Sequence, residues 1–218
     1  MNKGDLQTMN DAIAKAMNWR YAAQKLDPNK KVSEADLNTI LDAGRLAPSA
    51  FGVEPWHFIL IENPELQKKL YDEASPQDKV KDAPHFLVVA KRTDARETLA
   101  KNRVARSAKA MGVAESDLQG LRDMIDGTIA GKDDVQLASW VRAQVYIPLG
   151  AMIEAAALLG VDAGPMEGFD HNKFDEILGL KEMNLSSEYA IAFGYRLNDD
   201  AAQRPKARQT MDEVLTRM

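Results

Sequence analysis

The chain has 218 residues, of which 45% are hydrophobic and 28% are charged, so it can build a full apolar core beneath a solvated surface. A formal net charge of −5 argues against a nucleic-acid-binding protein, which normally carries a basic face. The absence of cysteine excludes disulfides, thiolate metal sites and a cysteine nucleophile. We expect one domain spanning residues 1–218.

Membrane and export signals are not visible in the sequence. Crossing a bilayer takes roughly 18–20 uncharged apolar residues, and the longest candidate, Val145 to Val161, is interrupted by Pro148 and Glu154. The first residues lack the apolar run of a secretory signal. We expect a cytoplasmic protein with neither a membrane nor a nucleic acid as its partner.

The first part of the chain predicts two helices. Apolar side chains recur at helical spacing over residues 5–18. Ser33 is followed by Glu34 and Asp36, which is typical of a helix N-cap with acid in the first turn, and this second helix ends before Pro48. Beyond it we expect a loop over 47–55, a strand over 56–62, a helix beginning at 63–65, and a strand over 85–90 that is buried on both faces.

The second part predicts mainly helix. A polar helical region covers 93–132, and a strongly apolar helix covers 139–160 with Gly160 as its C-terminal cap. Pro148 lies inside this helix, so a kink or break is expected there. A short helix over 170–178, a strand over 188–195 and a polar arm from 198 onward complete the chain. Few strands separated by helices indicate an α+β or α/β class.

Several familiar motifs are absent, which narrows the chemistry. There is no G-x-G-x-x-G fingerprint and no G-x-S-x-G nucleophile motif. The segment 127–132 imitates a phosphate loop, but Asp133 stands where a hydroxyl should bind Mg²⁺. The three histidines are far apart in the sequence, so no metal site is predicted.

Four short segments, in this order along the chain, resemble the nitroreductase family. They are WRYAAQKLD at 19–27, APSAFGVEPWHF at 47–58, GPMEGFD at 164–170 and RPKAR at 204–208. Each is weak alone, but the ordered set covers nearly the whole chain. The resemblance implies an α+β fold with a central mixed β-sheet flanked by helices, in an intertwined homodimer with an extended C-terminal arm.

The resemblance also implies an FMN-dependent oxidoreductase. Such an enzyme takes hydride from NADH or NADPH onto the flavin and, in a second step on the same flavin face, reduces a small acceptor such as a nitroaromatic or a quinone. The flavin performs the chemistry, so no catalytic acid or base and no metal are expected from the chain. Two alternatives stay open. One is a same-fold enzyme that removes halogen or fragments flavin, and the other is a flavin-storage protein without turnover.

The family motifs assign residues to both ends of the cofactor. By resemblance, Arg20, Lys206 and Arg208 would bind the FMN phosphate through charge-assisted hydrogen bonds, although the residues alone favour solvated tail charges for Lys206 and Arg208 and a helix cap for Arg20. Glu167 and Gly168 would bring backbone donors to the flavin N5 edge. The full cofactor-binding set is Arg20, Tyr21, Ala22, Gln24, Pro48, Ser49, Ala50, Gly52, Lys79, Pro165, Met166, Glu167, Gly168, Lys206 and Arg208.

The loop over 47–55 carries the remaining assignments. By resemblance, its Ser49 and Gly52 reach the FMN of the other subunit, and Gly52 permits close backbone approach. Phe51 is a candidate contact for a flat acceptor, or a simple packing residue. The apolar helix over 139–160 is expected at the centre of the core or at the dimer interface.

Three positions depart from the family pattern. Ala22 replaces a serine, Gln24 replaces a cation, and Glu54 replaces the glutamine before Pro-Trp. A cation near the flavin N1–O2 edge stabilises the reduced anion, so its loss at Gln24 predicts a lower reduction potential.

Overall fold

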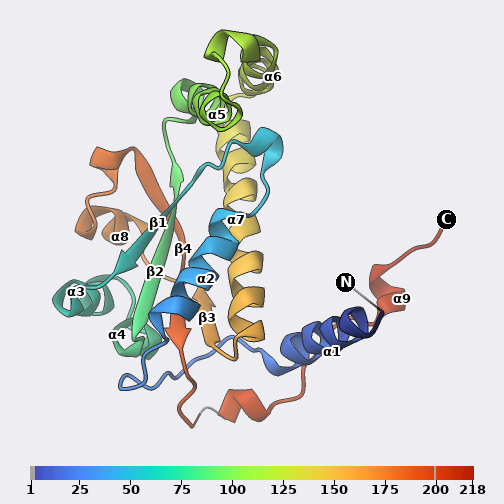
Figure 1. Cartoon of the computed structure of the whole chain (residues 1–218). Helices are drawn as coiled ribbons and strands as arrows, with labels where there is room; N and C mark the ends of the chain where they lie inside the picture. Colours follow the sequence, from blue (N-terminus) through green and yellow to red (C-terminus); the bar gives the residue numbers. More distant parts are fainter. Residues whose placement is uncertain (1–2, 199) are drawn as a thin grey trace.

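A four-stranded sheet with helices on both faces organises the computed structural model, which describes residues 3–198 and 200–218 (Figure 1). The strands are β1 (Trp56–Ile61), β2 (His85–Arg92), β3 (Asp162–Met166) and β4 (Leu185–Gly194). The helices are α1 (Lys3–Trp19), α2 (Glu34–Arg45), α3 (Pro64–Ala74), α4 (Asp78–Asp82), α5 (Ala95–Met111), α6 (Gln119–Ala130), α7 (Asp134–Leu158), α8 (His171–Ile177) and α9 (Met211–Val214).

The sheet differs from the expected mixed one. Its strand order is β1-β2-β4-β3, and every neighbouring pair of these strands is antiparallel. Parallel pairing in the described residues is limited to an isolated bridge between Ala22 and Ala163. The α+β class is confirmed. The continuous apolar run of β2 arises because helices cover both faces of the sheet, which does not require parallel neighbours.

The sequence concealed the edge strand β3. No strand was predicted before residue 188 in this part of the chain, but residues 162–166 pair with β4. Pro165 cannot donate a ladder hydrogen bond, and proline is tolerated in a strand at the edge of a sheet. Glycine and proline therefore masked the edge strand, whose outer side bonds to the segment 22–23 through the Ala22–Ala163 bridge.

Three helices begin at side-chain caps, of which the one at Ser33 was predicted. The Ser33 side chain accepts a hydrogen bond from the backbone N–H of Asp36 at the start of α2. Asn63 caps α3 in the same way, directly before Pro64, and Asp170 caps α8. Each side-chain oxygen satisfies an N–H that has no partner inside its own helix.

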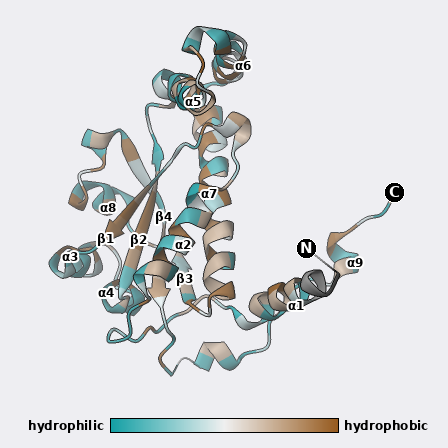
Figure 2. Ribbon diagram, in the orientation of Figure 1, coloured by the Kyte–Doolittle hydropathy of each residue, from teal (hydrophilic) through white to brown (hydrophobic). Residues whose placement is uncertain are grey.

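Alternate residues of β2 enter two different cores. Leu87 and Val89 pack with α2 and α7, whereas Phe86 and Val88 pack with α3, α4 and α8. Figure 2 shows the most hydrophobic residues on the strands, with α7 beside them also largely apolar. Burial on both faces explains why β2 shows no alternation of apolar and polar residues.

The long helix α7 continues through Pro148 without the expected break. Pro148 is buried, and α7 packs against α2 and the sheet. The proline removes one N–H hydrogen bond from a helix of 25 residues, and packing of this length of helix compensates for that loss. The cap at Gly160 is confirmed, because Gly160 adopts a left-handed φ of 71°.

Two parts of the chain extend away from the sheet. Helices α5 and α6 form a protrusion with its own apolar cluster against the start of α7, while α1 and the C-terminal segment lie together at the opposite end of α7 (Figure 1). Within the described ranges, no helix is long and apolar enough to cross a membrane. The same ranges contain no cluster of three or more His, Cys, Asp or Glu side chains arranged to hold a metal.

Candidate functional site

A cavity of about 600 Å³ lies between the end of α1 and the C-terminal segment. It brings together five of the predicted cofactor-binding residues, which come from opposite ends of the sequence. Lys206 Nζ donates a hydrogen bond to the main-chain carbonyl of Arg20. The five predicted residues lining the cavity are Arg20, Tyr21, Ala22, Lys206 and Arg208.

The described residues that line this cavity carry positive charges and no negative charge. Arg20, Arg204, Lys206 and Arg208 line it, and none of the described lining residues is acidic. Partial desolvation and the charges of Arg20, Arg208 and Arg196 lower the pKa of Lys206. The buried Nε of Arg20 has no hydrogen-bond partner in the described structure. A buried donor among unopposed cations is suited to an anion.

The segment 20–24 connects this cavity to β3. Ala22 forms a bridge to Ala163, and the backbone N–H of Ala23 donates to the Ala163 carbonyl (3.1 Å). A Cβ placed on Gly164 would lie 2.5 Å from the carbonyl oxygen of Ala23, so only glycine permits this approach. The predicted residue Gln24 is exposed beside this contact, and its Nε2 donates to the Ala22 carbonyl (3.0 Å).

Lys79, on α4, contacts β3. Its side chain is buried, and its Nζ donates to the carbonyl of Pro165 at 3.3 Å. Burial lowers the pKa of Lys79, because desolvation disfavours the ammonium form. The structure therefore places the Lys79 ammonium against the Pro165 carbonyl of β3, and its contact with the flavin stays a prediction.

The turn after β3 presents free backbone donors. Gln77 Nε2 donates to the carbonyl of Gly168 (2.7 Å), and the Asp170 N–H donates to the carbonyl of Ala74 (3.0 Å). Across the described residues, no hydrogen bond is formed by the backbone N–H of Glu167 or of Gly168. Both residues are exposed, in a turn that Gln77 and Ala74 hold in place.

The loop over 47–55 is strained and firmly held. Phe51, Gly52 and Glu54 all have positive φ values, of 54°, 67° and 48°, a region that costs non-glycine residues energy. Arg103 Nε on α5 donates to the Phe51 carbonyl (2.8 Å), and Arg106 on the same helix donates to the carbonyl of Gly52 (3.2 Å). Strain maintained by several contacts is a common feature of functional loops.

Within one chain, this loop is not near the cationic cavity. It lies beside α5, whereas Arg20 and Lys206 lie at the other end of α7 (Figure 1). The Ser49 hydroxyl accepts from the Glu54 N–H (2.9 Å), and Gln144 Oε1 on α7 accepts from the Ala50 N–H (2.7 Å). The predicted site residues thus form two separate groups.

Comparison with known proteins decides the family. The sequence model of the Nitroreductase family matches residues 17–195. The chain belongs to this family. A Bacillus subtilis protein named "Putative NAD(P)H nitroreductase YfkO" is 35% identical over 228 residues, covering 97% of this chain and 98% of the relative.

Solved structures of the nitroreductase fold superpose closely on this nitroreductase-family chain. The Bacillus subtilis nitroreductase ydfN gives a TM-score of 0.82 at 20% identity, covering 96% of this chain and 100% of the other. A structure from Exiguobacterium sibiricum in complex with FMN gives a TM-score of 0.79 at 19% identity, covering 94% and 97%. At these identities the superpositions show the fold.

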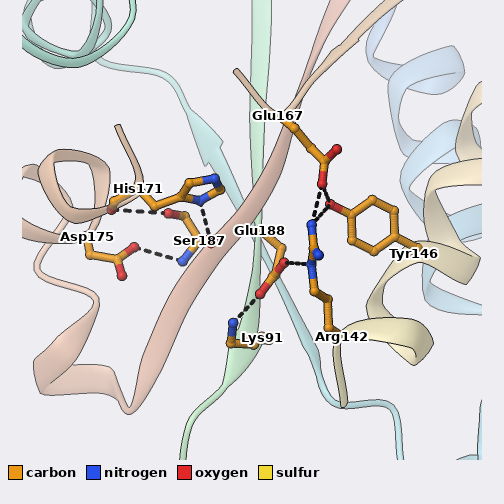
Figure 3. A network of polar contacts seen from close by, with 8 residues as sticks. All are labelled: Lys91, Arg142, Tyr146, Glu167, His171, Asp175, Ser187 and Glu188. Atoms are coloured by element: carbon orange, nitrogen blue, oxygen red, sulfur yellow. Dashed lines mark hydrogen bonds and ion pairs between the residues drawn. The ribbon is translucent and has the colours of Figure 1, made fainter. Parts of the chain in front are cut away.

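Sequence reasoning missed an ionic network beside the Glu167 turn of this nitroreductase-family protein. Arg142 on α7 bonds both Glu188 on β4 and Glu167, and Tyr146 also donates to Glu167 (Figure 3). A signal was present in the sequence, because Arg142 is a lone cation in an apolar helix and Glu188 is the first residue of the apolar strand predicted over 188–195. Neither matches a family motif, so both were overlooked.

Proposed function

We propose that this chain binds FMN and uses it as an NAD(P)H-dependent oxidoreductase for small acceptors. The observation that carries the proposal is the cavity lined by four cations, Arg20, Arg204, Lys206 and Arg208, with no acidic residue among its described lining. The FMN phosphate carries nearly two negative charges, and bidentate arginine contacts suit it. The unpartnered Nε of Arg20 would gain an acceptor there.

Residues along β3 would hold the flavin ring. The segment 20–24 runs from the cationic cavity to β3, which suits a cofactor with a phosphate at one end and a ring at the other. The unused N–H groups of Glu167 and Gly168 would serve as donors to the ring. The ammonium of Lys79 would oppose the negative charge of the reduced pyrimidine, and so replace the cation that Gln24 lacks.

A complete site would require a homodimer. The 47–55 loop lies against α5, whereas the cationic cavity lies between the end of α1 and the C-terminal segment (Figure 1), so the loop of a second copy would have to complete the pocket. Exposed apolar side chains on α1 and at the end of α7, among them Ile13 and Leu158, support an interface on these helices. Phe51, which is 39% exposed, would then face the acceptor.

Bound FMN would supply the hydride acceptor and donor for both half-reactions. The chain would position the ring, exclude water from one of its faces and adjust its reduction potential. No side chain is assigned a catalytic acid or base role. The first half-reaction uses NADH or NADPH, and the second uses a flat acceptor such as a quinone or a nitroaromatic.

An absorbance spectrum of the purified protein, followed by anaerobic titration with NADH and with NADPH, tests the proposal. We expect flavin absorbance that bleaches with the nicotinamide and returns when a quinone is added. Protein that stays colourless after incubation with FMN would refute flavin binding. Reduction without turnover on any acceptor would instead identify a flavin store, and activity confined to halogenated tyrosines or flavin would identify the other same-fold chemistries.

A further inference from the structure

Glu188 is a buried carboxylate at an irregularity of the central sheet. In the register between β2 and β4, Val89 pairs with Tyr189 and Ala90 pairs with Ser187. Glu188 is therefore an extra residue on β4, which makes it the centre of a β-bulge. Bulges redirect a side chain that would otherwise follow the alternation of its strand.

The bulge directs Glu188 towards two cations. Its side chain is only 5% exposed, and one carboxylate oxygen accepts a hydrogen bond from Lys91 Nζ on β2. The other oxygen accepts from Arg142 Nε on α7 at 2.8 Å (Figure 3). A buried carboxylate is costly unless it is paired in this way, so Glu188 fixes the position of Arg142.

Helix α8 fixes the bulge from the other side. The Ser187 N–H donates to Asp175 Oδ1 at 2.7 Å, and His171 Nδ1 lies 2.9 Å from the Ser187 carbonyl oxygen. Strand β3 ends at Met166, which pairs with Ala190, so α8 takes over as the partner of this stretch of β4. Figure 3 shows these contacts on the opposite side of β4 from Arg142.

Arg142 joins Glu188 to the turn that carries Glu167. Its second guanidinium nitrogen donates to Glu167 Oε1 at 2.6 Å and to the Tyr146 hydroxyl at 3.2 Å, while the Tyr146 hydroxyl donates to the same Glu167 oxygen. Burial, followed by the hydrogen bond to Glu167, raises the pKa of Tyr146 to about 12. At neutral pH both donors are therefore protonated and hold one carboxylate oxygen.

We propose, building on the function proposed above, that Arg142 is a positioning residue for the flavin. Anchored by Glu188, Arg142 fixes and neutralises the Glu167 side chain. It thereby sets the direction of the free N–H groups of Glu167 and Gly168 and the charge beside the ring. The two cations, Lys91 and Arg142, balance the two carboxylates. Arg142 acts through Glu167 and not by touching the cofactor.

The variant Arg142→Gln tests this role in the FMN-loaded protein. It leaves the Glu167 charge without its cation, and a negative charge near the ring opposes the electron-rich reduced flavin. We expect the equilibrium constant for flavin reduction to fall at least about tenfold, a negative shift of about 30 mV for two electrons, with a changed visible spectrum. Lys91 still pairs with Glu188, so the protein is expected to fold.

A double-substitution cycle distinguishes positioning from direct contact. If Arg142 acts through Glu167, then Arg142→Gln shifts the potential of the unmodified protein but causes little further shift in a Glu167→Gln background. An equal shift in both backgrounds would overturn the proposal in favour of direct contact. Arg142→Lys keeps the positive charge but loses the planar guanidinium that donates to both Glu188 and Glu167. Its reduction potential should therefore lie between those of the unmodified protein and Arg142→Gln.

A matched control separates a local role from general loss of an ion pair. Arg122 is a half-exposed arginine on α6 whose Nε lies 3.4 Å from Asp126, and Arg122→Gln should leave the potential unchanged. If Arg142→Gln lowers only the unfolding temperature and leaves the potential and spectrum unchanged, its role is structural and the proposal fails. If the unmodified protein binds no FMN, the proposed function fails instead, which makes the two failures distinguishable.

Discussion

Lys206 Nζ donates a hydrogen bond to the main-chain carbonyl of Arg20, across a separation of 186 positions in the sequence. This contact closes the C-terminal segment onto the end of α1 and assembles the cationic cavity. Both residues keep their charged groups available to a ligand, because Lys206 uses a backbone acceptor and the Arg20 Nε has no partner among the described residues.

The double variant Lys206→Ala/Arg208→Ala should release FMN more readily. Two cations would be lost from a cavity that has no described acidic lining. Hydrogen bonds to charged groups contribute about 1.5–3 kcal/mol each, and solvent exposure reduces this, so we expect the dissociation constant to rise about 10- to 100-fold. Fluorescence titration with FMN measures it. Lys69→Ala, an exposed lysine on α3, is the control, and equal affinity in both variants would remove the C-terminal cations from the site.

Lys79→Met should stabilise the protein without FMN while weakening flavin binding. Burial lowers the pKa of Lys79 in the folded state, so below that lowered pKa the folded chain carries a desolvated ammonium, whereas the ammonium of the unfolded chain is hydrated. Methionine removes that cost. As pH rises from the lowered pKa towards the ordinary value of 10.5, wild-type Lys79 loses its proton in the folded state and the advantage of the variant should shrink.

Urea unfolding of both proteins without FMN, at several pH values between 7 and about 10.5, measures this effect. A stability difference that is constant across the whole range would contradict the assignment of a desolvated charge to Lys79. FMN titration of the same samples gives the second readout, since a buried methionine cannot oppose charge on the reduced pyrimidine.

Gly52→Ala should destabilise the fold and disturb the predicted cofactor loop. Gly52 has a φ of 67°, and an added Cβ would lie 2.9 Å from the Arg103 guanidinium. A left-handed conformation costs a non-glycine residue about 1–2 kcal/mol, and we expect a loss of that size in thermal unfolding. Gly127→Ala, at an open position of α6, is the matched control and should gain about 0.5–1 kcal/mol. Identical changes in both would show that the loop is not strained.

The elements with local signals were predictable from the sequence. Ser33 and Asn63 marked helix starts through their own side-chain hydrogen bonds. The apolar run of β2 was enough to predict a strand buried on both faces. The structure added what depends on distant neighbours. Strand β3 was missed because Gly164 and Pro165 suggest a turn, and their place is decided by pairing with β4 and by contact with Ala23.

For the candidate site, too, residues in motifs were predictable from the sequence, whereas contacts between distant residues were not. Arg20, Lys206 and Arg208 lie in motifs, so their sequence predicted a shared site and the structure brings them to one cavity. Arg142 and Glu188 meet only because a bulge in β4 turns Glu188 towards α7, and bulges leave no regular pattern in a sequence. The mixed sheet was implied by the family resemblance, whereas the four described strands all pair antiparallel; strand direction depends on chain connections that no short motif records.

The C-terminal arm offers the sharpest test of the proposed dimer. Met211, Val214 and Leu215 are 67%, 59% and 43% exposed within one chain, and Figure 1 shows α9 far from the sheet. Apolar side chains on an extended arm gain stability when a second copy covers them. A chain ending after Gln209 retains Lys206 and Arg208 but loses these three side chains.

If the full chain is a dimer, we expect this truncated chain to dissociate at protein concentrations at which the full chain does not. The dimer dissociation constant should rise at least about tenfold, because burying one apolar side chain contributes about 1.5–3 kcal/mol. Sedimentation across a concentration series measures it, and a chain ending after Leu215 is the control. Because the Ser49–Gly52 loop of one copy would complete the pocket of the other, FMN should be lost in parallel with dissociation. Monomers that keep FMN at full affinity would show that Arg20, Lys206 and Arg208 form the site without a second copy.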